Sequence, residues 1–213
     1  MTPDQIEPYF TRPDGSYLCA RWGRPIVPVI FGVEEQTLQV FKGAIEGVVG
    51  MSGHKMAETD PELGANLMVF FCRDWDELTG VPNLEKLVDG LPELVKRLTA
   101  SDANQYRTFR FDEDGAIKAC VVFIRMDNAM SAQPAEEIAL AQAAQIMLTF
   151  GPNAFSAQSP LAIANNVTVL RPDIGAIIRA AYDPVMPASA QDNSHAFRLA
   201  ARITVGAGAN DDA

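Results

Sequence analysis

The segment 134–150 constrains the fold of this chain most, because it predicts a helix that is apolar almost all round. At 100° per residue, its large aliphatic and aromatic side chains cover most of the helical circle rather than one stripe. Such a helix needs other elements packed against most of its sides. We therefore expect a buried central helix that begins at Pro134, a residue suited to the first helical turn, and stops at the break formed by Gly151, Pro152 and Asn153.

A β-hairpin is expected just before this helix. Two runs rich in β-forming residues, 106–111 and 117–125, flank a short acidic turn that ends in Gly115. The second run is nearly all apolar, which is typical of a strand with neighbours on both sides. The hairpin should therefore place its second strand inside a sheet.

Further elements follow from the same periodicities. Segments 26–31 and 66–72 are short apolar runs typical of strands, and Pro28 removes a ladder donor, which favours an edge or an end for the first of them. Between the two, apolar residues recur at helical spacing. The expected helices cover residues 34–49, parts of 74–98, 172–182 and 190–202, and the polar stretch after residue 153 is expected to be a loop.

The length of 213 residues fits one large domain. A domain of this size buries roughly 70% of its unfolded surface and needs no metal or disulfide to fold. We divide the chain into an N-terminal arm (1–25) that packs on the body, a single domain (26–203) and a disordered tail (204–213). The predicted class is α+β, with a mixed β-sheet, packed helices and a helical C-terminal region.

Charge and hydropathy exclude several functions. The net charge of −10 disfavours binding to nucleic acid, and no basic patch is visible that would offset it. No run of about 18 apolar residues is present, so no transmembrane segment is expected. The polar start of the chain does not read as a signal peptide, which leaves open that one was removed.

The three cysteines give no sign of a metal or redox motif. Cys19, Cys72 and Cys120 are far apart in sequence, and no C-x-x-C pair occurs. Cys72 and Cys120 lie in apolar strands and are expected to be buried, inert thiols. A disulfide that uses Cys19 is the alternative in an oxidising compartment.

Histidine is scarce in this sequence. His54 and His195 are the only two, so a site of three histidines cannot be built. His54 follows Gly50-Met51-Ser52-Gly53, which is not a nucleophile elbow, and we interpret it as a loop residue without a catalytic role. His195 is expected on the surface of the last helix. No glycine-rich nucleotide-binding motif is present, and no cofactor is expected.

Three short motifs carry a resemblance to a known family. They are A-C-V-V-F-I at 119–124, E-E-I-A at 136–139 and L-R-P-D-I-G-A-I-I-R-A-A-Y-D-P at 170–184. Together with the order of elements, they resemble a bacterial family of uncharacterised, mostly exported proteins with a degenerate zincin-like metalloprotease domain. The resemblance implies a zincin-like fold and favours an exported or periplasmic location.

The resemblance also implies an altered active site. Aligned with the zinc-protease motif H-E-x-x-H, Glu137 matches the general base, whereas Glu136 and Leu140 replace the two zinc ligands. Residues 151–160 contain no side chain that could replace the third ligand. Catalytic zinc needs three protein ligands and one open position, so we expect no metal site of the usual kind.

Four residues of the buried helix are the candidate site residues. Glu137 is the candidate general base, and Glu136, Gln142 and Gln145 are candidates for binding. For the two glutamates, the alternative is a favourable interaction with the positive end of the helix dipole. For the two glutamines, the alternative is a pair of core amides bonded to the C-terminal loop, since amides on an apolar helix must find partners.

Three functions remain open from the sequence. The first is a non-catalytic zincin-like protein that binds a peptide, a protein or an envelope component beside the exposed edge of the hairpin, where an extended peptide can add as a strand. The second is a hydrolase with a carboxylate site at Glu136 and Glu137, which suits a hard cation better than zinc. The third is a structural or assembly module, with a homo-oligomer possible.

Overall fold

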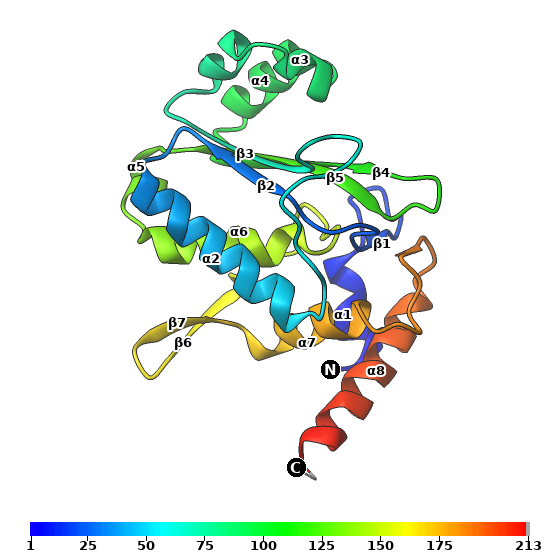
Figure 1. Cartoon of the computed structure of the whole chain (residues 1–213). Coiled ribbons are helices and arrows are strands. Elements are labelled where there is room, and N and C mark those ends of the chain that lie inside the picture. Colours follow the sequence, from blue (N-terminus) through cyan, green and yellow to red (C-terminus); the bar gives the residue numbers. More distant parts are fainter. Residues whose placement is uncertain (212–213) are drawn as a thin grey trace.

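The computed structural model describes residues 1–211 of the chain, with side chains up to residue 206. At its centre is a four-stranded mixed sheet with the order β2-β3-β5-β4 (Figure 1). Strands β2, β3 and β5 are parallel, and β4 is antiparallel to β5. The fold is α+β, as predicted. The strands are β2 (Pro28–Phe31), β3 (Leu67–Cys72), β4 (Gln105–Phe111) and β5 (Ile117–Arg125).

Helices cover both faces of this sheet (Figure 1). On one face lie α2 (Glu35–Met51) and α6 (Ala135–Ile146), which pack against each other and enclose the larger apolar core. On the other face lie three shorter helices over a second apolar core. These are η2 (Trp75–Gly80), α3 (Leu84–Leu87) and α4 (Leu91–Ala100).

The position of each strand agrees with its apolar pattern. Strand β5 lies between β3 and β4 and is buried on both faces from Ala119 to Ile124, as its nearly continuous apolar run predicted. Strand β2 is at one edge, which fits the missing N–H of Pro28. Strand β4 is at the other edge.

The first 25 residues contribute to the core of the protein. They contain α1 (Pro3–Ile6), η1 (Glu7–Tyr9) and β1 (Cys19–Ala20), and β1 pairs with β8 (Ser189–Ala190) near the C-terminus. Phe10 is fully buried against Phe150, with the two rings stacked. This part of the chain packs on segments far from it in sequence, through Phe150 and through β8.

Helix α6 ends at Ile146, several residues before the predicted break after Phe150. The carbonyl of Ile146 accepts a hydrogen bond from Nε1 of Trp22 at 2.8 Å, and the carbonyl of Met147 accepts one from Oη of Tyr182 at 2.9 Å. Thr149 then bonds through its side chain to the N-terminal segment. These tertiary partners replace the bonds that a longer helix would make, so the sequence-based end of this helix was wrong.

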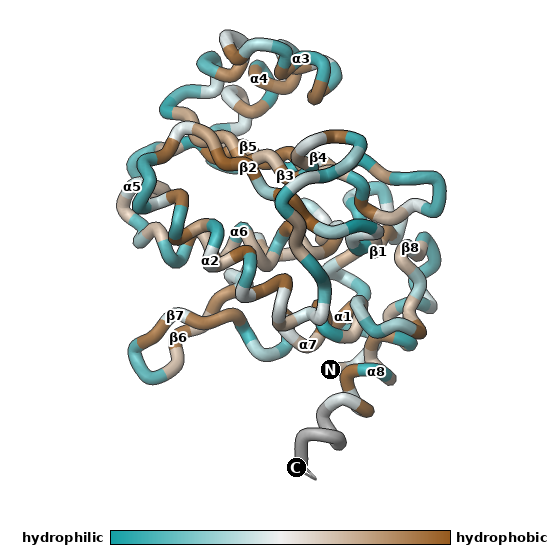
Figure 2. Tube along the Cα trace, in the orientation of Figure 1, coloured by the Kyte–Doolittle hydropathy of each residue, from teal (hydrophilic) through white to brown (hydrophobic). Residues whose placement is uncertain are grey.

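The stretch after residue 153, expected to be a loop, contains a β-hairpin. Its strands are β6 (Leu161–Ala164) and β7 (Val167–Leu170). The turn consists of Asn165 and Asn166, both with positive φ, as a two-residue hairpin turn requires. Figure 2 shows the two strands as apolar and the tip as hydrophilic. The alternation in this segment was missed because the strands are only four residues long.

The C-terminal part begins with α7 (Pro172–Ala181), in agreement with the prediction. The last helix, α8, spans His195–Asp211 and therefore begins later and extends further than the predicted 190–202. It runs through most of the segment 204–213 that was assigned to a tail, and residues 212–213 lie outside the described part. Among the described helices, none has the length and hydropathy needed to cross a bilayer.

Candidate functional site

Strand β4 has a free outer edge: no other strand of the described chain pairs with it there. The N–H of Arg125 donates to the carbonyl of Asn104 at 2.8 Å, whereas the N–H of Cys120 points toward β3 and donates to Asn66. In an antiparallel pair, residues bonded to the neighbouring strand alternate with residues whose N–H and C=O point away from it. The register therefore directs outward the backbone groups of Gln105, Arg107 and Phe109.

A cleft of about 530 Å³ lies beside this edge. One wall is strand β4, and the other is built from the segment 150–156, which follows helix α6, together with Arg12 and Leu18 of the N-terminal part. Gln145 of α6 also contributes to the lining. The residues 150–156 of the second wall come shortly after the early end of α6 at Ile146.

The side chain of Arg107 lines the cleft and is held by neutral groups. Its Nη2 donates to Oε1 of Gln142 at 2.6 Å, and its Nη1 donates to Oε1 of Gln145 at 3.3 Å. Its Nε is buried without a hydrogen-bond partner. Burial lowers the pKa of Arg107, and among the described side chains no carboxylate forms an ion pair with it.

The cleft is electropositive in an acidic protein. Two arginines, Arg12 and Arg107, line it, and none of the described residues that line it is Asp or Glu. Among the described side chains, neither arginine forms an ion pair with a carboxylate. Arg107 differs from Arg12 in its buried Nε, which has no hydrogen-bond partner.

Aromatic rings form the apolar part of the cleft. Phe150 and Phe155 pack edge to face, with centroids 5.0 Å apart. Both line the wall opposite β4, from which Phe109 and Phe111 also face the cleft. Phe111 is 40% exposed. The cleft therefore offers two arginines and an apolar surface beside a row of free backbone donors and acceptors.

Of the two predicted binding residues, Gln145 lines this cleft, whereas Gln142 is buried and bonds to Arg107; the partners of both differ from the expected ones. Nε2 of Gln142 donates to Oε1 of Gln105 at 2.8 Å, and both glutamine carbonyls accept from Arg107. The expectation of bonds to the C-terminal loop was wrong, because these amides face β4. Sequence reasoning missed Arg107, because no local pattern links β4 to α6.

The predicted acidic residues Glu136 and Glu137 are not brought to the cleft. Glu136 is exposed, and Oε1 of Glu137 accepts a hydrogen bond from Oγ1 of Thr168 on β7 at 2.8 Å. Glu137 therefore connects α6 to the β6–β7 hairpin. Within the described residues, no three side chains of His, Cys, Asp or Glu are placed to hold a metal ion.

The two histidines have structural surroundings. His195, expected on the surface, is only 4% exposed, and its Nδ1 lies 3.1 Å from Oη of Tyr17. Burial lowers the pKa of His195 to about 4. The prediction was wrong because α8 packs its first turn against the N-terminal segment. His54 donates from Nε2 to the carbonyl of Arg24 at 2.9 Å, and its ring packs on Tyr182.

The three cysteines are free and buried, as expected for Cys72 and Cys120. Burial raises the pKa of Cys72 to about 11 and that of Cys120 to about 12, and it also raises the pKa of Cys19. Since the thiolate is the nucleophile, thiols in this state are unreactive at neutral pH. They contribute to packing.

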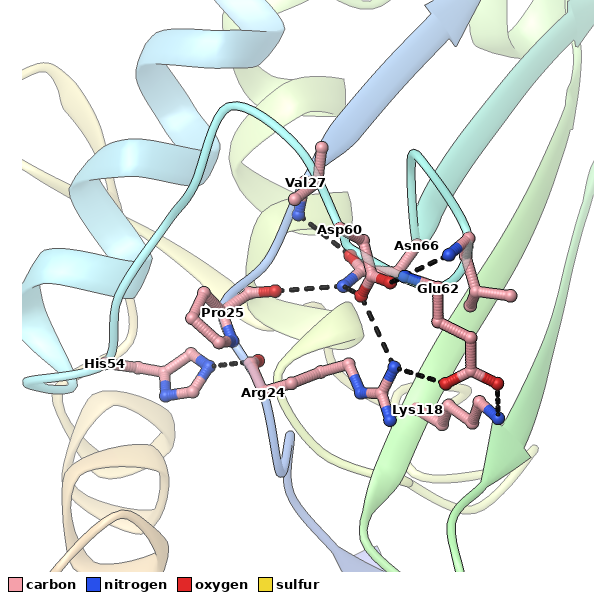
Figure 3. A network of polar contacts seen from close by, with 9 residues as sticks. Arg24, Pro25, Val27, His54, Asp60, Glu62, Asn66 and Lys118 are labelled. Atoms are coloured by element: carbon pink, nitrogen blue, oxygen red, sulfur yellow. Dashed lines mark hydrogen bonds and ion pairs between the residues drawn. The ribbon is translucent and has the colours of Figure 1, made fainter.

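A polar network at the start of the sheet is structural (Figure 3). The carboxylate of Asp60, which is 4% exposed, accepts from the N–H groups of Glu62 and Leu63 and from Nδ2 of Asn66. Oδ1 of Asn66 accepts from the N–H of Val27 at 2.8 Å. The network thereby fixes the loop before β3 against the chain that enters β2.

A larger cavity, of about 770 Å³, lies on the opposite face of the sheet, between β4 and α4. It carries charges of both signs, and those closest to the sheet have partners. Lys118 pairs with Glu62, and Arg110 donates to the carbonyl of Leu87 at 2.8 Å. We regard the smaller cleft as the better candidate site, since it lies beside the outward backbone groups of β4 and holds Arg107, whose Nε is buried without a partner.

Comparison with known proteins assigns no family: no protein-family model, curated protein or solved structure matches this chain. The chemistry of the site therefore rests on its geometry. The cleft presents hydrogen-bond donors and acceptors, two arginines and aromatic rings, and none of the described residues that line it is an acid, a histidine or a cysteine that could serve as a base or a nucleophile. Such a set of groups is suited to binding.

Proposed function

We propose that this protein is a non-catalytic, zincin-like domain that binds an extended peptide segment along the outer edge of β4. The order of β2, α2, β3, the β4–β5 hairpin and the buried α6 supports the comparison with a zincin-like domain. The ligand would add as a further strand to the sheet, with main-chain hydrogen bonds giving affinity and the cleft receiving alternate side chains.

The free backbone groups of β4 carry this proposal. Gln105, Arg107 and Phe109 direct their N–H and C=O groups to a side where no strand of the described chain lies. Exposed strand edges of this kind pair readily with other chains unless they are covered or broken. The regular pairing of β4 continues up to an irregularity at Arg110 and Phe111, which sets the end of the available edge.

A proline at the edge tests the proposal. Gln105→Pro removes an outward N–H, which edge strands tolerate because that group takes no part in the ladder. Gln105→Ala is the matched control, because it removes the same side chain and keeps the N–H. The probe is a blocked eight-residue peptide of alternating Ser and Val with a central Gln in place of one Val, titrated by calorimetry without a label.

We expect the proline variant to bind this neutral peptide about tenfold more weakly than the alanine variant, since one hydrogen bond is lost and the ring obstructs the edge. Circular dichroism confirms that both variants fold. Equal affinities for the two variants, or no binding to the unmodified protein, would contradict the proposal.

Two alternatives are distinguished by simple measurements. A hydrolase that uses Glu136 and Glu137 with a hard cation gains no support from the bond between Glu137 and Thr168, and stoichiometric metal that survives dialysis would revive it. An assembly module would use the same free edge to pair β4 with β4 of a second copy. Light scattering across protein concentrations would detect such a dimer.

A further inference from the structure

We infer that the peptide bound at β4 carries an acidic side chain opposite Arg107 and an apolar side chain two residues away from it. This inference deepens the proposed function and depends on it. It names the chemistry of the ligand, a carboxylate on an extended strand, from the charge and the register of the edge.

The register places the ligand side chain. When a strand adds to β4, the residue opposite Arg107 projects its side chain to the same face of the sheet as Arg107. That face is the one turned to α6, because Nη2 of Arg107 reaches Gln142 there. Directly opposite residues have Cβ atoms about 5 Å apart, which brings an Asp or Glu within reach of the guanidinium.

The charge of Arg107 selects a carboxylate. The guanidinium has five N–H donors, and two of them are used by the neutral carbonyls of Gln142 and Gln145. Burying a charge costs free energy unless the charge is paired with an opposite charge and hydrogen-bonded. Each Nη retains a second N–H, so a carboxylate in the cleft supplies both the missing charge and the missing acceptors.

The aromatic wall selects the apolar neighbour. Phe109 follows Arg107 by two residues on the same face of β4, and Phe150 and Phe155 stand across the cleft from it. A ligand residue two positions from the acid therefore points its side chain to these three rings. Burial of an aliphatic or aromatic side chain there adds to affinity without requiring a second charge.

The experiment compares three peptides on the unmodified protein. The first is the neutral Ser-Val peptide with central Gln, the second replaces that Gln by Glu, and the third is the neutral peptide with a free C-terminal carboxylate. We expect the Glu peptide to bind about tenfold more tightly than the neutral peptide, because hydrogen bonds between charged partners are about twice as strong as neutral ones. The third peptide tests whether the C-terminal carboxylate of a chain end, and not a side chain, binds in the cleft.

Two variants assign the effect to Arg107. Arg107→Gln should abolish the advantage of the Glu peptide over the neutral peptide when both are measured on this variant. The matched control is Arg110→Gln, which removes the same charge from the same strand but from the opposite face, where Arg110 bonds to the carbonyls of Lys86 and Leu87. In this control the advantage of the Glu peptide should remain.

A measurement that needs no variant supports the same conclusion. Between about 50 mM and 500 mM NaCl, the advantage of the Glu peptide should shrink on the unmodified protein, since salt screens the ion pair, while the affinity of the neutral peptide stays constant. Because it uses the unmodified protein, this measurement remains informative even if a substitution at Arg107 perturbs folding.

The outcomes separate the two proposals. Equal binding of the Glu and neutral peptides overturns the carboxylate inference and leaves binding at the edge intact. Tighter binding of the third peptide alone moves the carboxylate to a chain end and overturns the side-chain assignment. If none of the three peptides binds, the proposed function fails, and the inference fails with it.

Discussion

Gln142 on α6 accepts a hydrogen bond of 2.6 Å from Nη2 of Arg107 on β4, and this bond ties the free edge of the sheet to its buried helix. Gln142 is 4% exposed. The same amide donates to Gln105, so it connects two residues whose backbone groups form the edge. The polar positions of an otherwise apolar helix therefore serve to hold the edge strand in place.

We expect Gln142→Leu to lower the free energy of unfolding by about 2 kcal/mol, because it removes an acceptor from a buried cation. Urea denaturation measures this loss, with Gln36→Leu on the exposed side of α2 as the control, expected within about 0.5 kcal/mol of the unmodified protein. The double variant with Arg107→Leu should cost less than the sum of the two single changes. Additive losses would show that the two side chains are energetically independent.

Thr149→Val should destabilise the protein by about 2 kcal/mol. The hydroxyl of Thr149 accepts from the N–H of Ala20 at 2.8 Å and donates to the carbonyl of Leu18 at 3.1 Å, so the isosteric valine leaves buried backbone groups unpaired. Thr168→Val is the matched control, and a loss below about 1 kcal/mol is expected because that bond is only part-buried. Thermal unfolding of the two variants measures both losses of stability, and equal losses would contradict the prediction.

Stability should rise with pH between about 4 and 6.5, in part because of His195. Its pKa is lowered by burial from 6.5 to about 4, so in this window the unfolded chain binds a proton that the folded protein does not. The stabilisation is present above pH 6.5, is lost as the pH falls toward 4, and amounts to at most about 3 kcal/mol. His195→Gln should flatten the pH dependence of the unfolding free energy in this window.

The second histidine should contribute to the same pH dependence. The pKa of His54 is also lowered by burial, so His54→Gln should change the slope with the same sign. An unchanged slope in the His195 variant would contradict the assignment of this window to the buried ring next to Tyr17.

Asp60→Asn should cost about 2 kcal/mol at pH 7. Burial raises the pKa of Asp60, but the N–H groups of Leu63 and Glu62 and the amide of Asn66 outweigh it, so the pKa lies below its ordinary value of 3.8. The stabilisation by the carboxylate is therefore present above about pH 4 and is lost as the pH falls through the lowered value. Denaturation at pH 7 and pH 3 should show that the unfolding free energies of the Asp60 variant and the unmodified protein differ more at pH 7 than at pH 3. Glu58→Gln, a change at an exposed neighbour, should show no such dependence.

Local patterns predicted the secondary structure wherever an element was long or strongly periodic. The hairpin of β4 and β5, helix α2 and helix α7 were located within about two residues of their observed bounds, because hydrophobic period and turn residues act over short distances. The β6–β7 hairpin was missed although Asn165 and Asn166 carry its turn signal, since four-residue strands provide few repeats.

The sequence indicated the polar contacts of α6 only in part. Gln142 and Gln145 were expected to have hydrogen-bond partners, because an amide on an apolar helix must find one, and both bond to Arg107. Their partner Arg107 lies 35 and 38 residues away in sequence, on another element. No local pattern links the two segments. The contact of the Arg107 guanidinium with two neutral amides therefore follows only from the packing of β4 on α6.

The composition and periodicity of the chain were enough to establish an α+β protein, a hairpin with an apolar inner strand, a buried helix and too few histidines for a three-histidine zinc site. These properties depend on residue type and near neighbours. The end of α6, the burial of His195 and the charge of the cleft at Arg107 depend on contacts between segments more than 30 residues apart. Since a buried hydrogen bond or charge is defined by the group that meets it in space, such properties follow from packing.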